Sequence, residues 1–211
     1  MPYKSFTFQQ LKERFGLEQS FSPILSAKVV PVESSEWLWR AIEINSNTAV
    51  TTAKERSERI ISPILLEFRE RNHRQFYLFS GWSFDVDAEL GLNGECDFLM
   101  SSVPFDFEIK VPVFALRATK GGEIESCVPQ CAAQMVAAQL FNEREHNSIP
   151  AVYRCVTTGV VWRFLKLEEN NLIIDIDVYY SNSQKSEVCP MPYALCPMPY
   201  ALCPMPYALC P

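Results

Sequence analysis

The sequence predicts a single mixed α/β domain, with one mixed central sheet flanked by helices. Two observations predict it. Helical segments come first, and strand-like segments, one strong helix and further strand-like segments follow, which is typical of one sheet packed against helices. In addition, 48% of the 211 residues are hydrophobic, so the chain can bury a core, and its length fits one ordinary domain.

Two helices are predicted before residue 50. Ser5 can cap a helix that extends to Phe15, and Gly16 ends it because glycine readily adopts the left-handed conformation of a helix C-cap. A loop follows, and Ser34 or Ser35 starts the second helix. Its apolar residues recur at helical spacing: Trp37, Leu38, Ala41 and Ile42.

A long amphipathic helix is predicted over residues 52–72, and Pro63 should kink it because proline lacks the backbone N–H that a continuous helix needs. A second strong helix, rich in Ala, Gln and Met, is predicted over residues 128–144. The strand-like segments lie between turn signals: 75–81, 83–86, 96–101, 111–119, 151–157, 160–167 and 172–178.

The end of the chain is a repeat. Residues 189–211 repeat the sequence Cys-Pro-Met-Pro-Tyr-Ala-Leu, in which two prolines exclude a helix and disfavour a central strand. We predict an irregular or disordered tail after a single domain of residues 1–188. We interpret the repeat as a translated tandem DNA repeat rather than as a metal-binding or partner-binding strip.

Charge and cysteine content exclude several classes of protein. The net charge of −6 excludes a protein that coats nucleic acid through charge alone, although a local basic groove stays compatible with it. The sequence has no run of 18 apolar residues and no signal-peptide pattern, so we expect a cytoplasmic protein without a membrane partner. The cysteines of the body are expected to be small buried hydrophobes rather than disulfides or zinc ligands: Cys96, Cys127, Cys131 and Cys155.

Three stretches carry polar residues in an order that suggests chemistry. Asp97 enters an apolar strand in GECDFL, Lys120 follows the strand in FALRATK, and Gln130 opens the helix VPQCAAQMVAAQ. Together with ERSERIISPILLEFR and VTTGVVWRFLKLE, this set resembles the PD-(D/E)XK nuclease superfamily, which has the restriction-endonuclease-like fold. More narrowly, residues 1–182 resemble a family of uncharacterised cyanobacterial proteins assigned to that superfamily.

The resemblance implies Mg²⁺-dependent hydrolysis of DNA phosphodiesters. In such a site, one or two Mg²⁺ ions hold the phosphate, lower the pKa of the attacking water and stabilise the leaving oxygen. Mg²⁺ prefers carboxylate oxygens, so neighbouring strands supply acids. A lysine near the attacking water stabilises the developing charge or helps to deprotonate the water.

The family pattern implies a role for each residue. It places the first acid on Asp97, the lysine of the E-x-K element on Lys120, an auxiliary glutamate on Glu58, and the glutamine of the following helix on Gln130. Alternation along a strand puts positions 118 and 120 on one face, where both can point at one metal-bound water.

Ala118 stands where relatives carry the glutamate of the E-x-K element. Loss of a metal-binding carboxylate weakens Mg²⁺ binding and is expected to cost orders of magnitude in rate. We therefore expect a nuclease-like domain with impaired catalysis, and its status as an enzyme stays open. Glu123 or Glu125, just beyond a glycine pair, is an alternative metal ligand, which would give an active endonuclease.

Each candidate site residue can also be explained by a structural role without any catalytic function. Asp97 could be a strand-end acid paired with a basic residue, Lys120 an ordinary lysine after a strand, and Glu58 a solvated helix acid. Gln130 and Gln134, four residues apart, could lie on a helix surface. One basic cluster could contact phosphates, but it is more typical of a helix C-terminus: Arg69, Arg71, His73 and Arg74.

Three functions therefore stand side by side. The chain is a Mg²⁺-dependent DNA endonuclease, a non-catalytic domain that at most binds DNA or a protein partner, or the folded product of a decaying gene. Many relatives of this fold cut DNA as dimers, so the resemblance adds a homodimer as one expected assembly.

Overall fold

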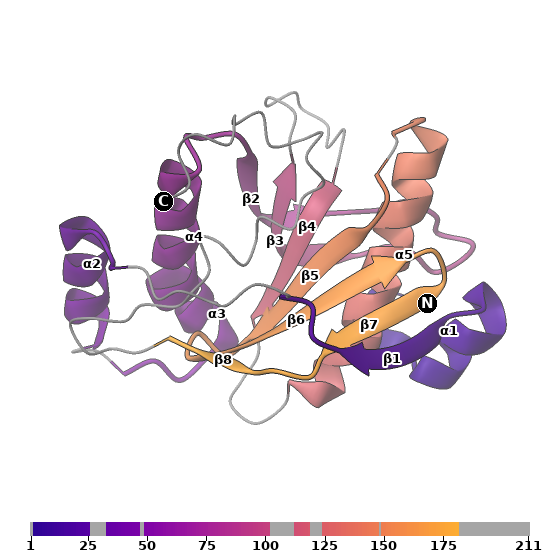
Figure 1. Cartoon of the computed structure of the whole chain (residues 1–211), viewed down its shortest axis with the longest axis horizontal. Coiled ribbons are helices and arrows are strands. Elements are labelled where there is room, and N and C mark those ends of the chain that lie inside the picture. The colour runs from indigo at the N-terminus through magenta and orange to yellow at the C-terminus, as the bar shows by residue number, and fades with distance from the viewer. Residues whose placement is uncertain are drawn as a thin grey trace.

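The computed structural model describes residues 2–25, 33–46, 49–101, 112–118, 124–147 and 149–181. Within these ranges, one mixed sheet forms the centre of the molecule and helices cover both of its faces (Figure 1). The predicted class, a mixed central sheet flanked by helices, is confirmed. The repeat of residues 189–211 lies outside the described ranges.

The sheet has the strand order β1-β7-β6-β5-β4-β3-β2, and β8 pairs with β6. The pairs β1–β7 and β4–β5 are parallel, and the other described pairs are antiparallel. The strands are β1 (Glu18–Ser22), β2 (Tyr77–Ser83), β3 (Glu95–Ser101), β4 (Pro112–Ala118), β5 (Val152–Thr157), β6 (Val161–Glu168), β7 (Asn171–Asp175) and β8 (Tyr179–Tyr180).

The helices lie in two layers. Helices α1 and α5 pack on one face of the sheet, and α2, η2 and α4 pack on the other (Figure 1). In chain order they are η1 (Tyr3–Ser5), α1 (Phe8–Phe15), α2 (Glu36–Ser46), α3 (Ala53–Arg56), η2 (Ser57–Ile61), α4 (Ser62–Arg71), η3 (Glu125–Cys127) and α5 (Val128–Arg144).

Helix α1 begins after Thr7, which corrects the prediction that Ser5 caps it. The Thr7 side chain accepts a hydrogen bond from the Gln10 backbone N–H, and the Gln10 side chain accepts one from the Thr7 N–H. This reciprocal capping box satisfies two backbone donors at once, whereas a lone serine satisfies one. Gly16 ends the helix as predicted, with a φ of 65°.

Strand β1 corrects the prediction of a loop after Gly16. Its sequence, Glu-Gln-Ser-Phe-Ser, lacks the regular alternation of apolar residues that marks a strand. The segment is extended because it pairs with β7 at the edge of the sheet, where Glu18 lies opposite Asn171 and Ser22 lies opposite Asp175.

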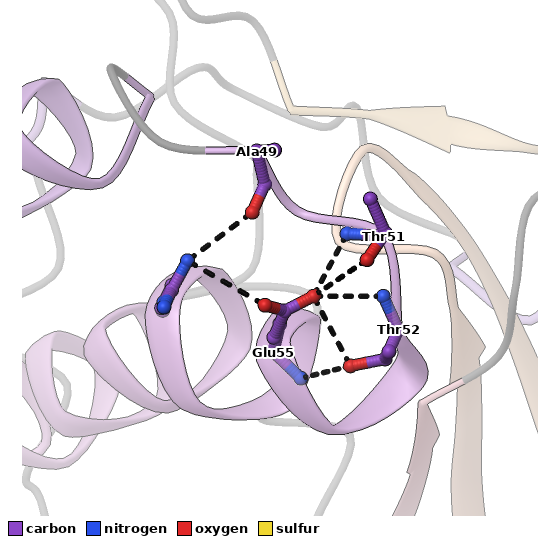
Figure 2. Close-up of polar contacts among 5 residues, drawn as sticks. Ala49, Thr51, Thr52 and Glu55 are labelled. Carbon is purple, nitrogen blue, oxygen red and sulfur yellow. Dashed lines mark hydrogen bonds and ion pairs between the residues drawn. The ribbon is translucent and has the colours of Figure 1, made fainter.

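The predicted long helix is confirmed as one helical run from α3 to α4, with a distortion just before Pro63. Thr52 and Glu55 form its N-terminal capping box (Figure 2). In η2 the helix widens to π-helical turns, and the Ser62 N–H donates to the Ser57 carbonyl, five residues back. Proline cannot donate to the ladder, and the local change of helix type is a common response to that gap.

Some predicted boundaries are wrong. Strand β2 ends at Ser83, and residues 84–86 lead into a turn that the Asp87–Leu92 bridge closes. Strand β7 ends at Asp175, before the predicted residue 178. In α2, Leu38 is buried as predicted, but Trp37 is 52% exposed because its neighbours occupy the face toward α4.

The sheet separates two hydrophobic cores. The core under α5 includes Leu11, Leu99, Met135, Val152, Val156 and Leu165. The core under α4 includes Leu38, Ile61, Leu65, Phe98, Trp162 and Phe164. Three of the body cysteines are buried as expected: Cys96, Cys131 and Cys155.

Candidate functional site

Asp97 lies on β3 at a point where the side chains no longer alternate regularly between the two faces of the sheet. Cys96 faces α5, because the Nε2 atom of Gln134 donates to its Sγ at 3.4 Å, whereas Phe98 packs in the core under α4. In a regular strand these two residues would share a face. On β2, Gly81 lies between the partners of Cys96 and Phe98, and its φ of 62° belongs to the left-handed region that glycine adopts easily. Asp97 is half-buried at this irregularity.

The strand that ends at Ala118 is the direct neighbour of β3. Phe98 pairs with Leu116 in antiparallel register, and on its other side β4 pairs with β5, where Ala118 lies opposite Thr157. The structure therefore brings together the two segments to which the family pattern assigns the first acid and the E-x-K element.

Gln130 and Gln134 lie on the face of α5 that packs against the sheet. Their exposed fractions are 9% and 2%, so the alternative that both lie on the helix surface is wrong. A spacing of four residues places them on one helical face, and here that face is the buried one. The Nε2 atom of Gln134 also donates to the carbonyl oxygen of Glu95 at 3.1 Å, which ties α5 to the start of β3.

The glutamates that could add ligands are exposed. Glu58 lies in η2, on the opposite face of the sheet from α5; its side chain is 61% exposed and pairs with Lys54 at 3.9 Å. Glu125 is 72% exposed at its side chain and pairs with Arg163 at 3.3 Å. Two further candidates, Lys120 and Glu123, lie outside the described residues.

The sequence analysis missed Arg154, the most buried charge near this site. It lies on β5 between Val152 and Val156, which face α5, and its exposed fraction is 0%. Among the residues that the structure describes, its Nε, Nη1 and Nη2 atoms have no hydrogen-bond partner. The alternation of Ala-Val-Tyr-Arg-Cys-Val-Thr already contained the signal, because it places this arginine on an inward face.

Electrostatic interactions connect Arg154 to both α5 and β3. Burial alone lowers the pKa of Arg154, but the neighbouring Cys131, Cys96 and Asp97 outweigh burial, so the pKa is raised. The guanidinium therefore stays charged. Burial raises the pKa of the Cys96 thiol, which stays protonated at neutral pH.

The donor chemistry around Asp97 fits part of a Mg²⁺ site. Mg²⁺ in proteins is usually held by one or two carboxylates together with waters and substrate phosphates. Asp97 supplies one carboxylate, and Ala118 at the end of the neighbouring strand supplies none. Within the described ranges, no group of three or more His, Cys, Asp or Glu side chains is arranged to hold a metal ion.

The basic cluster at the end of α4 is engaged within the chain. Arg69 donates from Nε to the Phe76 carbonyl at 3.0 Å, and Arg74 pairs with Glu70 at 2.9 Å. Arg71 is also engaged: its Nε donates to Glu67, and its Nη2 donates to the Glu33 carbonyl. These contacts support the structural interpretation of the cluster over phosphate binding.

The remaining observations concern the chain as a whole. No helix in the described part of the chain combines the length and the apolar character that crossing a bilayer requires. Comparison with protein-family models finds no match to this sequence, and comparison with curated proteins finds none either.

Proposed function

We propose that this chain is a nuclease-like domain, related to Mg²⁺-dependent DNA endonucleases, in which catalysis is impaired because Ala118 replaces a metal-binding glutamate. The observation that supports this best is the pairing of β3 with β4. Asp97 lies at an irregular point of β3, Ala118 ends the neighbouring strand, and α5 with its buried Gln130 follows along the chain.

The proposal rests on what each side chain offers. A bound Mg²⁺ would polarise the phosphate and lower the pKa of the attacking water. Asp97 would hold it through carboxylate oxygens, and Gln130 would position the start of α5 against the sheet. Ala118 has only a methyl group where the second carboxylate belongs, so the ion would be held by too few charged ligands.

An active endonuclease with a substitute acid is the second candidate function. The exposure of Glu125 favours it, because an exposed ion pair such as Glu125–Arg163 is weak and costs little to break. A domain that binds DNA or a protein partner without cleavage is the third. The engagement of Arg69, Arg71 and Arg74 within the chain argues against the end of α4 as its DNA surface.

Plasmid cleavage in Mg²⁺ or Mn²⁺ tests the proposal. We expect very weak cleavage or none from the natural chain, and no change when Asp97 is replaced by alanine. Robust cleavage that Asp97→Ala abolishes would contradict impairment. If Glu125→Gln also abolishes it, the substitute acid is identified.

Restoring the acid gives the complementary test. We expect Ala118→Glu to bind Mg²⁺ more tightly than the natural chain in calorimetry, because a second carboxylate joins Asp97. Ala118→Gln is the matched control, since it has the same shape without the charge, and it should bind as the natural chain does. Equal affinity of both variants would count against the assignment of position 118 to the site.

A further inference from the structure

Strand β1 forms one end of the sheet, and its main chain is open on the side away from β7 (Figure 1). The Glu18 N–H donates to the Asn170 carbonyl at 2.8 Å, and the Ser22 carbonyl accepts a hydrogen bond from the chain just beyond β7. Alternate residues of an extended strand direct their main-chain groups to opposite sides. Gln19 and Phe21 therefore direct their N–H and carbonyl groups outward, where the described residues supply no further strand.

The open edge of β1 also carries an exposed aromatic side chain. Gln19 lies opposite Leu172 and Phe21 lies opposite Ile174, and both of these partners belong to the core under α5. Residues that pair across neighbouring strands share one face of the sheet, so Gln19 and Phe21 lie on the face that α1 and α5 cover. Phe21 is nevertheless 61% exposed. A strand added to this edge would cover the ring and pair with the open main-chain groups.

A pocket beside this edge offers space for a side chain of an added strand. It has a volume of about 370 Å³, lies between α1 and the start of β1, and is lined by Phe8, Gln9, Lys12, Leu17, Glu18 and Gln19. Because Gln19 lines the pocket, a residue that pairs with Gln19 directs its side chain toward it. Phe8 and Leu17 supply apolar walls for that side chain, and Lys12 supplies a positive charge.

Two charges at this pocket form no ion pair with any residue that the structure describes: Lys12 and Glu18. Both residues are exposed. In an antiparallel added strand, an acid opposite Gln19 can reach Lys12, and the next residue lies opposite Glu18. Opposite charges stabilise a pair of strands and like charges destabilise it, so this edge favours an acid that is followed by a base.

This charge pattern also distinguishes between possible occupants of the edge. Strand β1 of a second copy contains no basic residue, so it cannot place a cation opposite Glu18. The repeat of residues 189–211 contains no charged residue, so it complements neither Lys12 nor Glu18. A segment of another protein that carries both charges fits the edge better than either of these.

We propose that β1 is a docking edge for an extended peptide segment of a partner protein, which adds antiparallel to β1. The segment carries an apolar residue opposite Phe21, an acid opposite Gln19 and a base opposite Glu18. Main-chain hydrogen bonds supply affinity, and the pocket with its two charges supplies specificity. This inference goes beyond the proposed function and does not rest on it, because four strands separate β1 from β3 in the sheet.

Two synthetic peptides with blocked ends test the charge pattern. The probe Thr-Val-Thr-Glu-Lys-Thr is titrated into the natural chain, and the Kd is measured from the NMR signals of the Gln19 and Phe21 amides. We expect it to bind about tenfold more tightly than the swapped control Thr-Val-Thr-Lys-Glu-Thr at low salt, and this ratio should shrink at high salt. Equal affinities, or signals that neither peptide moves, overturn the proposal.

Reversing the charges of the protein gives the complementary test. Lys12→Glu/Glu18→Lys exchanges the two charges at exposed positions, so the fold should be retained. This variant should prefer the swapped control over the probe by a similar factor, because each peptide charge then meets the opposite sign. A variant that still prefers the probe overturns the assignment of Lys12 and Glu18 to the docking edge.

N-methylation of the probe separates strand pairing from simple charge attraction. A methyl group on the glutamate amide removes the donor that faces the Gln19 carbonyl, so binding should weaken about tenfold or more. A methyl group on the lysine amide points away from β1 and should change the Kd less than about twofold. Equal effects overturn strand addition.

Sedimentation of the natural chain without peptide tests the second copy as an occupant. We expect a chain whose sedimentation Phe21→Lys does not change, because the edge of β1 is free without the partner segment. A dimer that Phe21→Lys dissociates would place a second copy on the edge and overturn the proposal.

Discussion

Gln134 and Glu95 are joined across the interface between α5 and β3, where the side-chain amide of Gln134 donates to the Glu95 main-chain carbonyl at 3.1 Å. Gln134 is 2% exposed, so water does not replace this bond readily. The start of β3 is therefore held by a helix side chain in addition to its neighbouring strands. Because Asp97 lies two residues further along, this bond also helps to fix the candidate site.

Replacing Gln134 by leucine should lower the free energy of unfolding by about 1 kcal/mol, the usual net value of one buried hydrogen bond. Urea denaturation measures it, and hydrogen exchange at the first β3 amides should accelerate. Gln139→Leu is the matched control on the same helix, because its side chain is half-buried and a change within about 0.5 kcal/mol is expected. Equal effects at both positions would show that the bond to Glu95 contributes nothing.

Glu67 links the start of α2 to α4 through hydrogen bonds, and we expect it to contribute to the free energy of unfolding. It is 8% exposed and accepts hydrogen bonds from the Ser35 N–H at 3.0 Å, the Ser35 hydroxyl at 2.6 Å and Arg71 Nε at 2.7 Å. Burial raises the pKa of Glu67, but the bonds from Ser35 and Arg71 outweigh it, so the pKa lies below its usual value. Glu67→Gln should cost about 1–3 kcal/mol at pH 7, because the amide cannot accept from all three donors.

Glu70→Gln is the control for that measurement. Glu70 also pairs with an arginine four residues along the chain, but its side chain is 52% exposed, so a smaller change is expected.

The lowered pKa of Glu67 also determines how its contribution to the free energy of unfolding changes with pH. Its contribution is present above the pKa of the unfolded chain and is lost as the pH falls through the folded value. A Glu67→Gln effect that is equal at pH 7 and pH 3 contradicts this assignment.

Glu55 gives the N-terminus of α3 a dependence on pH. Its Oε2 atom accepts from the Thr51 and Thr52 N–H groups at 2.9 and 3.0 Å, and the Thr52 hydroxyl accepts from the Glu55 N–H at 3.1 Å (Figure 2). The bonds from Thr52 and Thr51 lower the pKa of Glu55 to about 2. The stabilisation is therefore complete above about pH 4.5 and disappears as the pH falls toward 2.

The melting temperature at pH values from 6 to 2 measures this effect. The difference between the natural chain and Glu55→Gln should shrink steadily below about pH 4.5. Glu58→Gln, three residues along the same helical run, is the control for the loss of one exposed carboxylate, because Glu58 is 61% exposed and pairs with Lys54. A Glu55→Gln difference that does not change with pH would contradict the capping role of the carboxylate.

Periodic segments of the fold were predictable from the sequence, and segments fixed by distant partners were not. The predicted helix 128–144 coincides with α5, because both its composition and its flanks favour a helix. Strand β1 was missed because its extended shape depends on β7, which lies far along the chain. The π-helical form of η2 was also not predictable, although Pro63 marked the place of the distortion.

For the candidate site, the sequence predicted which segments meet but not what surrounds them. The pairing of β3 with β4 agrees with the order of the motifs. The burial of Gln130 and Gln134 could not be predicted, since a spacing of four residues describes a buried face and an exposed face equally well. Arg154 was missed because the candidates came from the family pattern, which assigns none of its site roles to a residue of β5.

The position of strand β1 has a consequence for folding while the chain is synthesised on the ribosome. The Ser20 hydroxyl on β1 donates a hydrogen bond to the Asn171 Oδ1 atom on β7 at 2.9 Å, although 151 positions separate the two residues in the sequence. At about 5–20 residues per second, translation of the intervening stretch takes about 8–30 s. Throughout that interval the first strand has been made but its partner has not, so it emerges with an open main-chain edge that chaperones or foreign strands can reach before the sheet is completed.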